Sequence, residues 1–597
     1  MEIEDLLYEK HRGDSKQLEL IFSEEPRIVV TAPAGCGKTT TMVSKIVREL
    51  CSGRIHPGKK VLAMTFSVNA AIKIKESVND ILPEFVLNPD ILISKVDIAN
   101  YHQFSIKMLY KYGFALCPEL KKLGDYVVVG DTDNRMLYLL SDSEKDVIKK
   151  FTTSLENADA KGVSELIDAY WNIQIEKLFT NQLITYNGII VAALKLLENS
   201  VVADFYKKYY SLVIVDEFQD TNILGAMLIK NLMGDNQVIF LGDNIQKIYG
   251  FLGAVEGILG LATESFSARE IVLETNYRFI NNERMKALDL FIRDYAEKYS
   301  ESDLCAEAYL KVLESDEEEN KFIVSGIKQM LCDGADTVAI LMRAGWQGLS
   351  LAKELDKEWI TYFNALYSEQ DVEYIRFYKV AIEEYQKCVK GKAVRVNLNE
   401  CLKNVKNREL EVYEEDDRSF VFKSLYSLLE KLFEQSFSWH GTSQERYEKI
   451  AFTLYSNGLK HMLEYIDEKI VLTTIHSAKG LEWDYVIIPQ MNSHVFPSSK
   501  YVCKLCKSNN GCKYYNNRCI LTFNPDMYRL IKDEFSIFYV AVTRAKKEVF
   551  LTANIGKNNW GFDKKTNCMV NLKGLSQIDY TWDEVLSTQQ PTTPNKK

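Results

Sequence analysis

One stretch, residues 28–50, constrains the fold of this chain more than any other. Residues 28–30 form a short β-branched run, and the segment TAPAGCGKTT follows at 31–40. Beyond it, apolar side chains recur at helical spacing: Met42, Ile46, Val47 and Leu50. A strand, a glycine-containing loop and a helix in this order are the context that a phosphate-binding loop requires. The stretch therefore predicts an α/β domain that binds phosphate groups.

The residue types in this loop suit a nucleotide. Gly35 and Gly37 would let backbone N–H groups close on phosphate oxygens, and a helix N-terminus adds partial positive charge. We expect Lys38 to reach the β- and γ-phosphates and the Thr39 hydroxyl to bind Mg²⁺. Ala32 stands where the generic pattern has its first glycine, so a chance turn remains an alternative on this segment alone. The predicted nucleotide contacts of the loop are Ala34, Gly35, Cys36, Gly37, Lys38, Thr39 and Thr40.

A second motif supplies carboxylates. Residues 212–215, LVIV, form a continuous apolar run typical of a strand buried on both faces, and DEFQD follows at 216–220. Asp216 suits an outer-sphere Mg²⁺ ligand, and Glu217 suits a base that orients the attacking water. An acidic loop that merely ends a strand is the alternative. In combination with the phosphate loop upstream, the motif predicts a site that hydrolyses ATP.

Further motifs follow in a fixed order between residues 14 and 552. They include DSKQ at 14–17, LETNYR at 273–278, TTIHSAKGLEW at 473–483 and FYVAVTRAK at 538–546. With the two motifs above, these segments resemble the UvrD/Rep/PcrA helicases of superfamily 1 over most of the chain. The resemblance implies two RecA-like P-loop NTPase cores with parallel sheets flanked by helices, each with a mainly helical insertion. It also implies an ATP-dependent 3′→5′ DNA helicase that moves on single-stranded or tailed DNA.

The same resemblance assigns nucleotide contacts outside the loop. Gln17 would read adenine, Tyr277 would stack on the base, and Glu482 would contact the ribose. These three roles come from the family pattern and not from spacing. An isolated Gln on a helix is otherwise an ordinary surface residue.

Three further residues would act on the γ-phosphate. By resemblance Gln246 senses it, Arg278 contacts it and Arg544 serves as an arginine finger. Two guanidiniums facing the γ-phosphate would neutralise the charge that develops during phosphoryl transfer. Since both arginines belong to the second core, hydrolysis would require that core to close on the first. The predicted catalytic residues are Lys38, Glu217, Gln246, Arg278 and Arg544.

The resemblance also implies a DNA track lined by aromatic and imidazole side chains. Phe66 and Phe251 are expected to stack on bases, and stacking suits any base because every base has a π-face. His102, Tyr249 and His476 are expected beside the same track.

Three features of the sequence argue against parts of the predicted DNA-binding track or against its coupling to ATP hydrolysis. By pattern alone, Phe66 and Phe104 could instead be core aromatics. Leu252 stands where the family usually has Arg, which weakens the expected coupling between DNA and ATP. The second insertion is smaller than is usual in the family, which favours a translocase that unwinds poorly without help.

The order of the motifs predicts the organisation of the chain. The predicted parts are a first core at 1–104 and 186–275 with a helical insertion at 105–185, a second core at 276–372 and 466–560 with a reduced helical insertion at 373–465, a four-cysteine loop at 500–522, and a C-terminal extension and tail at 561–597.

Four of the twelve cysteines are bunched between the last two motifs. The spacing Cys503-x₂-Cys506-x₅-Cys512-x₆-Cys519 matches tetrahedral metal ligation. So short a loop has no core of its own, and a metal could supply its folding energy. We expect Zn²⁺ ahead of an iron–sulfur cluster, while free thiols or a redox pair are the alternatives. The common family pattern lacks these cysteines.

Bulk composition excludes little. The net charge is −10, yet a nucleic-acid binder needs only a local basic groove. No apolar run reaches the roughly 18 residues of a membrane span, and the acidic, mixed N-terminus does not resemble a signal peptide. We therefore expect a cytoplasmic protein without a membrane partner.

Three classes of function agree with these observations. The first is an autonomous helicase. The second is the motor subunit of a larger DNA repair or anti-phage defence complex with a protein partner such as a nuclease, since no nuclease motif is evident in the chain. The third is a non-motor switch protein with a degenerate ATPase, which the complete set of predicted catalytic residues disfavours.

Overall fold

The structure is a computed structural model. It describes residues 3–65, 68–86, 88–250, 253–298, 302–389, 397–413, 419–437, 439, 443–455, 457–493, 495–497, 528–557, 561 and 563–587. The chain divides into two compact units, Met1–Tyr277 and Arg278–Lys597.

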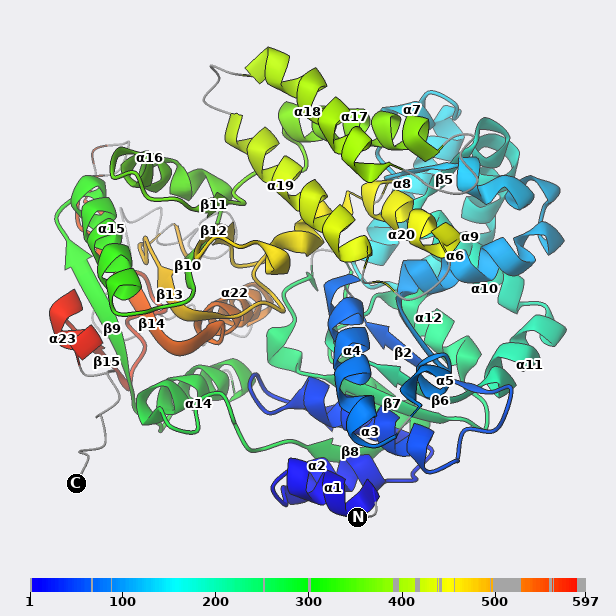
Figure 1. The fold of residues 1–597 in the computed structure, drawn as a ribbon, viewed down its shortest axis with the longest axis horizontal. Coiled ribbons are helices and arrows are strands. Elements are labelled where there is room, and N and C mark those ends of the chain that lie inside the picture. Colours follow the sequence, from blue (N-terminus) through cyan, green and yellow to red (C-terminus); the bar gives the residue numbers. More distant parts are fainter. Residues whose placement is uncertain are drawn as a thin grey trace. The chain divides into compact units, whose positions relative to one another are not determined.

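A six-stranded parallel sheet organises the first unit (Figure 1). Its strand order is β3-β2-β6-β7-β1-β8. The strands are β1 (Arg27–Thr31), β2 (Lys60–Thr65), β3 (Val96–Asn100), β6 (Tyr210–Val215), β7 (Gln237–Gly242) and β8 (Arg269–Val272). All of them run in one direction, so their carboxyl ends share one edge of the sheet, where ligand sites of open α/β sheets form.

Helices cover both faces of this sheet. They are α1 (Ile3–Lys10), α2 (Ser15–Phe22), α3 (Lys38–Cys51), α4 (Val68–Ile81), α5 (Pro89–Ile93), α6 (Tyr101–Tyr112), α10 (Tyr186–Leu197), α11 (Ser200–Tyr209), α12 (Ile223–Leu232) and α13 (Ile258–Phe266). Between α6 and α10 the chain forms α7 (Asn134–Leu137), α8 (Asp142–Glu156), α9 (Ala160–Ile173) and the short paired strands β4 (Val127–Val129) and β5 (Leu183–Thr185).

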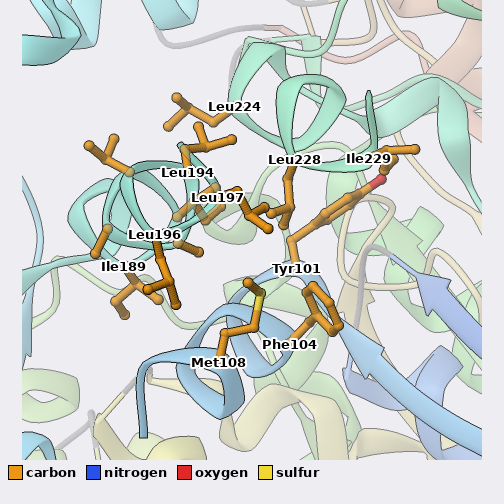
Figure 2. Close-up of a cluster of buried hydrophobic side chains, with 14 of the residues drawn as sticks. Tyr101, Phe104, Met108, Ile189, Leu194, Leu196, Leu197, Leu224, Leu228 and Ile229 are labelled. Carbon is orange, nitrogen blue, oxygen red and sulfur yellow. The ribbon is translucent and has the colours of Figure 1, made fainter. Parts of the chain in front are cut away.

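The alternation of side chains along β1 explains the two cores. Ile28 and Val30 belong to a cluster with α3 and α4, whereas Val29 belongs to a cluster with α6, α10 and α12. Successive side chains of a strand point to opposite faces, so both faces of this apolar run are buried. Figure 2 shows the second cluster, in which Tyr101, Phe104 and Met108 of α6 meet leucines of α10 and α12.

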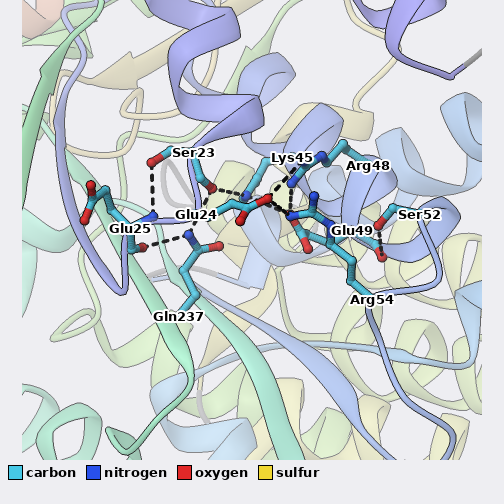
Figure 3. A network of polar contacts seen from close by, with 9 residues as sticks. All are labelled: Ser23, Glu24, Glu25, Lys45, Arg48, Glu49, Ser52, Arg54 and Gln237. Carbon is cyan, nitrogen blue, oxygen red and sulfur yellow. Dashed lines mark hydrogen bonds and ion pairs between the residues drawn. The ribbon is translucent and has the colours of Figure 1, made fainter.

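A buried ionic network fastens α3, the helix that follows the phosphate loop. Lys45 is 1% exposed and donates to the Ser23 carbonyl at 2.7 Å and to Glu49 at 2.8 Å. Arg48 also binds Glu49, at 2.7 Å (Figure 3). Both cations are paired, which satisfies charges that burial would otherwise penalise. The network holds α3 against the segment that leads into β1.

The second unit contains a seven-stranded parallel sheet of order β11-β12-β10-β13-β14-β9-β15. Its strands are β9 (Ala306–Leu313), β10 (Val338–Met342), β11 (Phe363–Asn364), β12 (Ile470–Thr474), β13 (Trp483–Ile488), β14 (Ala545–Asn554) and β15 (Leu575–Ile578). The flanking helices are α14 (Glu283–Lys298), α15 (Asp316–Cys332), α16 (Leu349–Lys357), α22 (Tyr528–Val542) and α23 (Trp582–Ser587). Four more helices precede β12: α17 (Val372–Val389), α18 (Leu398–Tyr413), α19 (Ser419–Ser436) and α20 (Ser443–Tyr455).

The predicted fold class is confirmed, since each unit is a parallel sheet flanked by helices. The finer boundaries between cores and insertions stay predictions. In the described ranges, no helix combines the length and apolar character needed to cross a bilayer.

Candidate active site

The loop between β1 and α3 has the backbone that close approach to phosphate requires. Gly35 and Gly37 adopt φ values of +79° and +73°, which L side chains rarely adopt. A Cβ added at Gly37 would lie 2.6 Å from Gln17 Nε2. The positive φ therefore favours glycine at Gly37, and any side chain there would also displace the Gln17 amide.

Lys38 joins the loop to the carboxylates at the end of β6. Its Nζ lies 2.5 Å from Glu217 Oε1 and 3.1 Å from Asp216 Oδ1. Burial opposes the charged ammonium, but the two carboxylates overcome it and raise the pKa of Lys38 above its ordinary value. Burial also raises the pKa of Asp216, against the pull of Lys38. The loop cation and both acidic residues thus form one compact charge cluster.

Glu217 is also held from its other side. Its backbone has a φ of +53°, and Gln219 Nε2 donates to Glu217 Oε2 at 2.5 Å. Gln219 Oε1 accepts from the Asp243 N–H at 3.1 Å, and Gln246 Nε2 donates to Asp243 Oδ2 at 3.0 Å. A continuous chain of hydrogen bonds therefore runs from Glu217 to Gln246 through Gln219 and Asp243.

Sequence reasoning assigned no role to Gln219 or Asp243. Both side chains are fully buried, and buried polar groups in folded proteins are paired. The sequence shows only that each residue follows an apolar strand segment, and the structure shows that these segments are the neighbouring strands β6 and β7. Only the strand order brings the two loops together.

The predicted base contacts converge on the phosphate loop. The Tyr277 N–H donates to the Gly35 carbonyl at 2.9 Å, and its hydroxyl donates to Asp14 Oδ2 at 2.7 Å. Asp14 also caps α2 by accepting from the Gln17 N–H at 3.0 Å. Gln17 Nε2 in turn donates to the Cys36 carbonyl at 3.2 Å. Gln17 and Tyr277 are thus fixed on the same loop.

The donor set of this site fits Mg²⁺. Thr39 lies in the first turn of α3, directly after Lys38, and Asp216 ends β6 with its carboxylate 3.1 Å from the Lys38 ammonium. Hydroxyl and carboxylate oxygens are the ligands that Mg²⁺ prefers in nucleotide sites. These two residues would hold the ion.

In the second unit, Arg278, Glu482 and Arg544 lie together. Arg278 forms an ion pair with Glu482 and donates to the Thr543 carbonyl. Arg544 donates to the carbonyls of Val540 at 3.0 Å and Leu481 at 3.2 Å. Glu482, which the resemblance assigns to the ribose, and the two arginines that it assigns to the γ-phosphate therefore form one group in the second unit, beside the start of β13 and the end of α22.

Comparison with known proteins identifies the family. The model of the UvrD/REP helicase N-terminal domain matches residues 14–267, and that of the UvrD-like helicase C-terminal domain matches residues 368–555. The chain belongs to the UvrD/Rep family of DNA helicases. Membership in this helicase family implies a DNA substrate and the use of ATP and Mg²⁺.

Relatives agree with this assignment. A probable DNA helicase II homolog of Rickettsia conorii is 23% identical over 655 residues, which cover 91% of this chain and 92% of the relative. A second one, of Mycoplasma genitalium, is 23% identical over 620 residues and covers 89% of this chain and 83% of that relative. The ATP-dependent DNA helicase PcrA of Bacillus subtilis is 26% identical over 282 residues, 44% of this chain and 37% of that protein.

Two residues with a predicted role at DNA, Tyr249 and His102, follow strands of the first sheet, β7 and β3. Burial raises the pKa of the Tyr249 phenol, and the charges of Asp220 and Glu217 raise it further. His102 begins α6, and its ring lies edge-on to Tyr186 with centroids 5.1 Å apart. Burial lowers the pKa of His102 to about 4, which leaves the imidazole neutral at pH 7.

His476 lies in the turn that follows β12 in the second unit. Burial lowers its pKa to about 4, and the charges of Arg343 and Lys479 lower it further. Of these two cations, Arg343 is paired with Glu534 at 2.5 Å, and the role of His476 at DNA stays a prediction.

Several predicted residues lie outside the described part of the chain: Phe66, Phe251, Leu252, Cys503, Cys506, Cys512 and Cys519. Among the described residues, no group of three or more His, Cys, Asp or Glu side chains could hold a metal ion. Phe104 is described and is 2% exposed, packed edge-on to Tyr206 at 5.9 Å. For Phe104 the core alternative holds.

Proposed function

We propose that this helicase is an ATP-driven motor that moves 3′→5′ along single-stranded DNA and separates the strands of a tailed duplex. The observation that carries the ATP-driven part is the cluster of Lys38, Asp216 and Glu217, joined by hydrogen bonds to Gln246. The 3′→5′ polarity is supported by family resemblance alone.

The chemistry follows from the charges. In this structure the single Lys38 ammonium is shared by the carboxylates of Asp216 and Glu217, to which the proposal gives the metal and the attacking water. Nucleotide phosphates offer Lys38 a stronger anionic partner, so their arrival frees Glu217 to accept a proton from water. Bound Mg²⁺ would neutralise phosphate charge. Arg278 and Arg544 of the second unit would add positive charge at the γ-phosphate.

Hydrolysis couples to DNA through neighbours of the same cluster. Gln246 and Tyr249 both belong to the segment that follows one strand, β7, and Gln246 is joined to Glu217 by hydrogen bonds through Asp243 and Gln219. A base that stacks near Tyr249 would therefore bias the position of Gln246 and the hydrogen bonds that lead to Glu217. We expect single-stranded DNA to stimulate hydrolysis.

Steady-state ATP hydrolysis with and without single-stranded DNA tests the proposal. We expect single-stranded DNA to raise the rate of ATP hydrolysis about tenfold or more. Bound DNA would order Gln246 and Glu217, and a correctly placed general base contributes at least that much to the rate. Lys38→Ala is the control that removes the site. Equal rates with and without DNA would contradict a nucleic-acid motor.

A motor subunit that needs a protein partner, such as a nuclease, is the second candidate function. The insertion before β12, smaller than usual for the family, favours it, because a small insertion offers less surface for opening a duplex. Co-purification of a second protein, or unwinding only in its presence, would favour this candidate over an autonomous helicase.

We also propose that Cys503, Cys506, Cys512 and Cys519 bind Zn²⁺, with an iron–sulfur cluster as the alternative. Elemental analysis of the purified chain is expected to find about one zinc per chain, since four thiolates at this spacing complete a tetrahedral site. A Cys503→Ser, Cys506→Ser variant is expected to lose the metal. Absence of both zinc and iron from the wild-type protein would contradict the proposal.

A further inference from the structure

His11 is a buried residue that contacts Gln17 on one side and helix α3 on the other. It follows α1 directly and is 3% exposed. Its Nδ1 lies 2.5 Å from Gln17 Oε1, and its Nε2 lies 2.8 Å from Ser44 Oγ. Ser44 belongs to α3, the helix that carries Lys38. Both ring nitrogens are therefore engaged inside the protein.

The donors and acceptors of this contact can be assigned in only one way for a neutral ring. Gln17 Nε2 donates to the Cys36 carbonyl, so the atom facing His11 is the Gln17 carbonyl oxygen, which only accepts. His11 Nδ1 must then carry the proton. Its Nε2 accepts from the Ser44 hydroxyl. Burial lowers the pKa of His11, which agrees with a neutral ring.

We propose that His11 is a positioning residue that fixes the Gln17 amide in the orientation that reads adenine, and so sets the preference of the site for ATP over GTP. The inference rests on the proposed ATP site, in which Gln17 faces the base. His11 itself touches no ligand.

The chemistry of the bases explains why orientation matters. Adenine presents an N6 amino donor beside the N7 acceptor, whereas guanine presents two acceptors, O6 and N7. Gln17 uses one lone pair of its oxygen for His11 and one N–H for Cys36, which leaves one acceptor and one donor. That remaining pair matches adenine and opposes the O6 of guanine. A Gln17 free to rotate would present the matching pair only part of the time.

The test compares two amide substitutions of similar size. His11→Asn keeps a donor at the δ position, next to Gln17, whereas His11→Gln moves its amide to the ε position, toward Ser44. Affinities for ATP and GTP are measured by competition against a fluorescent adenine nucleotide, which does not depend on hydrolysis. Thermal unfolding midpoints are recorded for each variant, and all assays are run below the lowest midpoint.

We expect His11→Gln to lower the ratio of ATP to GTP affinity about fivefold to tenfold, mainly through ATP, as for loss of about one oriented hydrogen bond. His11→Asn should keep the ratio near that of the wild type. Gln17→Ala should lower the ratio at least as far as His11→Gln, and the double variant no further, because His11 acts through Gln17. Should His11→Gln not fold, His11→Leu takes its place with the same expectation.

An unchanged ratio in His11→Gln, an equal loss in His11→Asn, or additive losses in the double variant would overturn the inference. Failure of the proposed function looks different: the wild-type chain would show no DNA-stimulated hydrolysis, while the binding ratios would still report on His11.

Discussion

Replacing Glu217 with glutamine is expected to lower the rate of ATP hydrolysis by about 10³, within the range for loss of a general base. The Glu217 carboxylate ends a hydrogen-bonded chain from Gln246, with Gln219 Nε2 at 2.5 Å. Glutamine has the same shape but cannot accept the proton of the attacking water. Lys38 keeps Asp216 as a partner, so ATP affinity should change little.

Single-turnover phosphate release with excess enzyme measures this effect directly, and nucleotide competition measures affinity in parallel. The matched control is Glu198→Gln, whose carboxylate is 65% exposed and pairs with Lys195 at 2.6 Å. Exposed pairs contribute little, so the control should hydrolyse ATP at the wild-type rate. Hydrolysis by Glu217→Gln within a few-fold of the wild type would remove Glu217 from the proposed mechanism.

Replacing Lys38 with alanine is expected to abolish hydrolysis and weaken nucleotide binding, since the β- and γ-phosphates lose their cation. We also expect the variant to be less stable by about 1–3 kcal/mol, because the buried Asp216 carboxylate loses its cationic partner. Asp216 is 3% exposed, and in the wild type it shares this one cation with Glu217.

The loss of stability in Lys38→Ala should depend on pH. Burial raises the folded pKa of Asp216 above its unfolded value, and loss of Lys38 raises it further. A carboxyl with a raised folded pKa stabilises the fold below its unfolded pKa, and that contribution is lost as pH rises toward the folded pKa. The deficit relative to the wild type should therefore be larger at about pH 8 than at about pH 5.

Urea denaturation at both pH values measures the deficit. A second substitution, Asp216→Asn, should remove most of the pH dependence, because it replaces the carboxyl that titrates. A deficit that is the same at both pH values in Lys38→Ala would contradict the assignment of Asp216 as the buried titrating group.

The sequence predicted the parts of the site that lie within single segments. The phosphate loop and the acidic motif each follow an apolar strand directly, so their strand, loop and residue types could be read together. The same apolar runs also predicted parallel sheets. A strand buried on both faces is apolar at every position, whereas a half-buried strand alternates apolar and polar residues.

Contacts that depend on strand order could not be predicted. Gln219 and Asp243 meet only because β6 and β7 are neighbours, and His11 meets Gln17 and Ser44 only after α2 folds onto α3. Phe104 fits a stacking platform and a core aromatic equally well by pattern, and only packing with Tyr206 decides between them.

Strand displacement by the purified chain tests the central claim most directly. The assay uses Mg²⁺, ATP and duplexes with either a 3′ or a 5′ single-stranded tail, with Lys38→Ala as the inactive control. We expect the wild-type chain to unwind the 3′-tailed duplex only. If the wild-type chain unwound only the 5′-tailed duplex, the proposed 3′→5′ polarity would be contradicted. If Lys38→Ala unwound both duplexes, the proposed dependence on ATP would be contradicted.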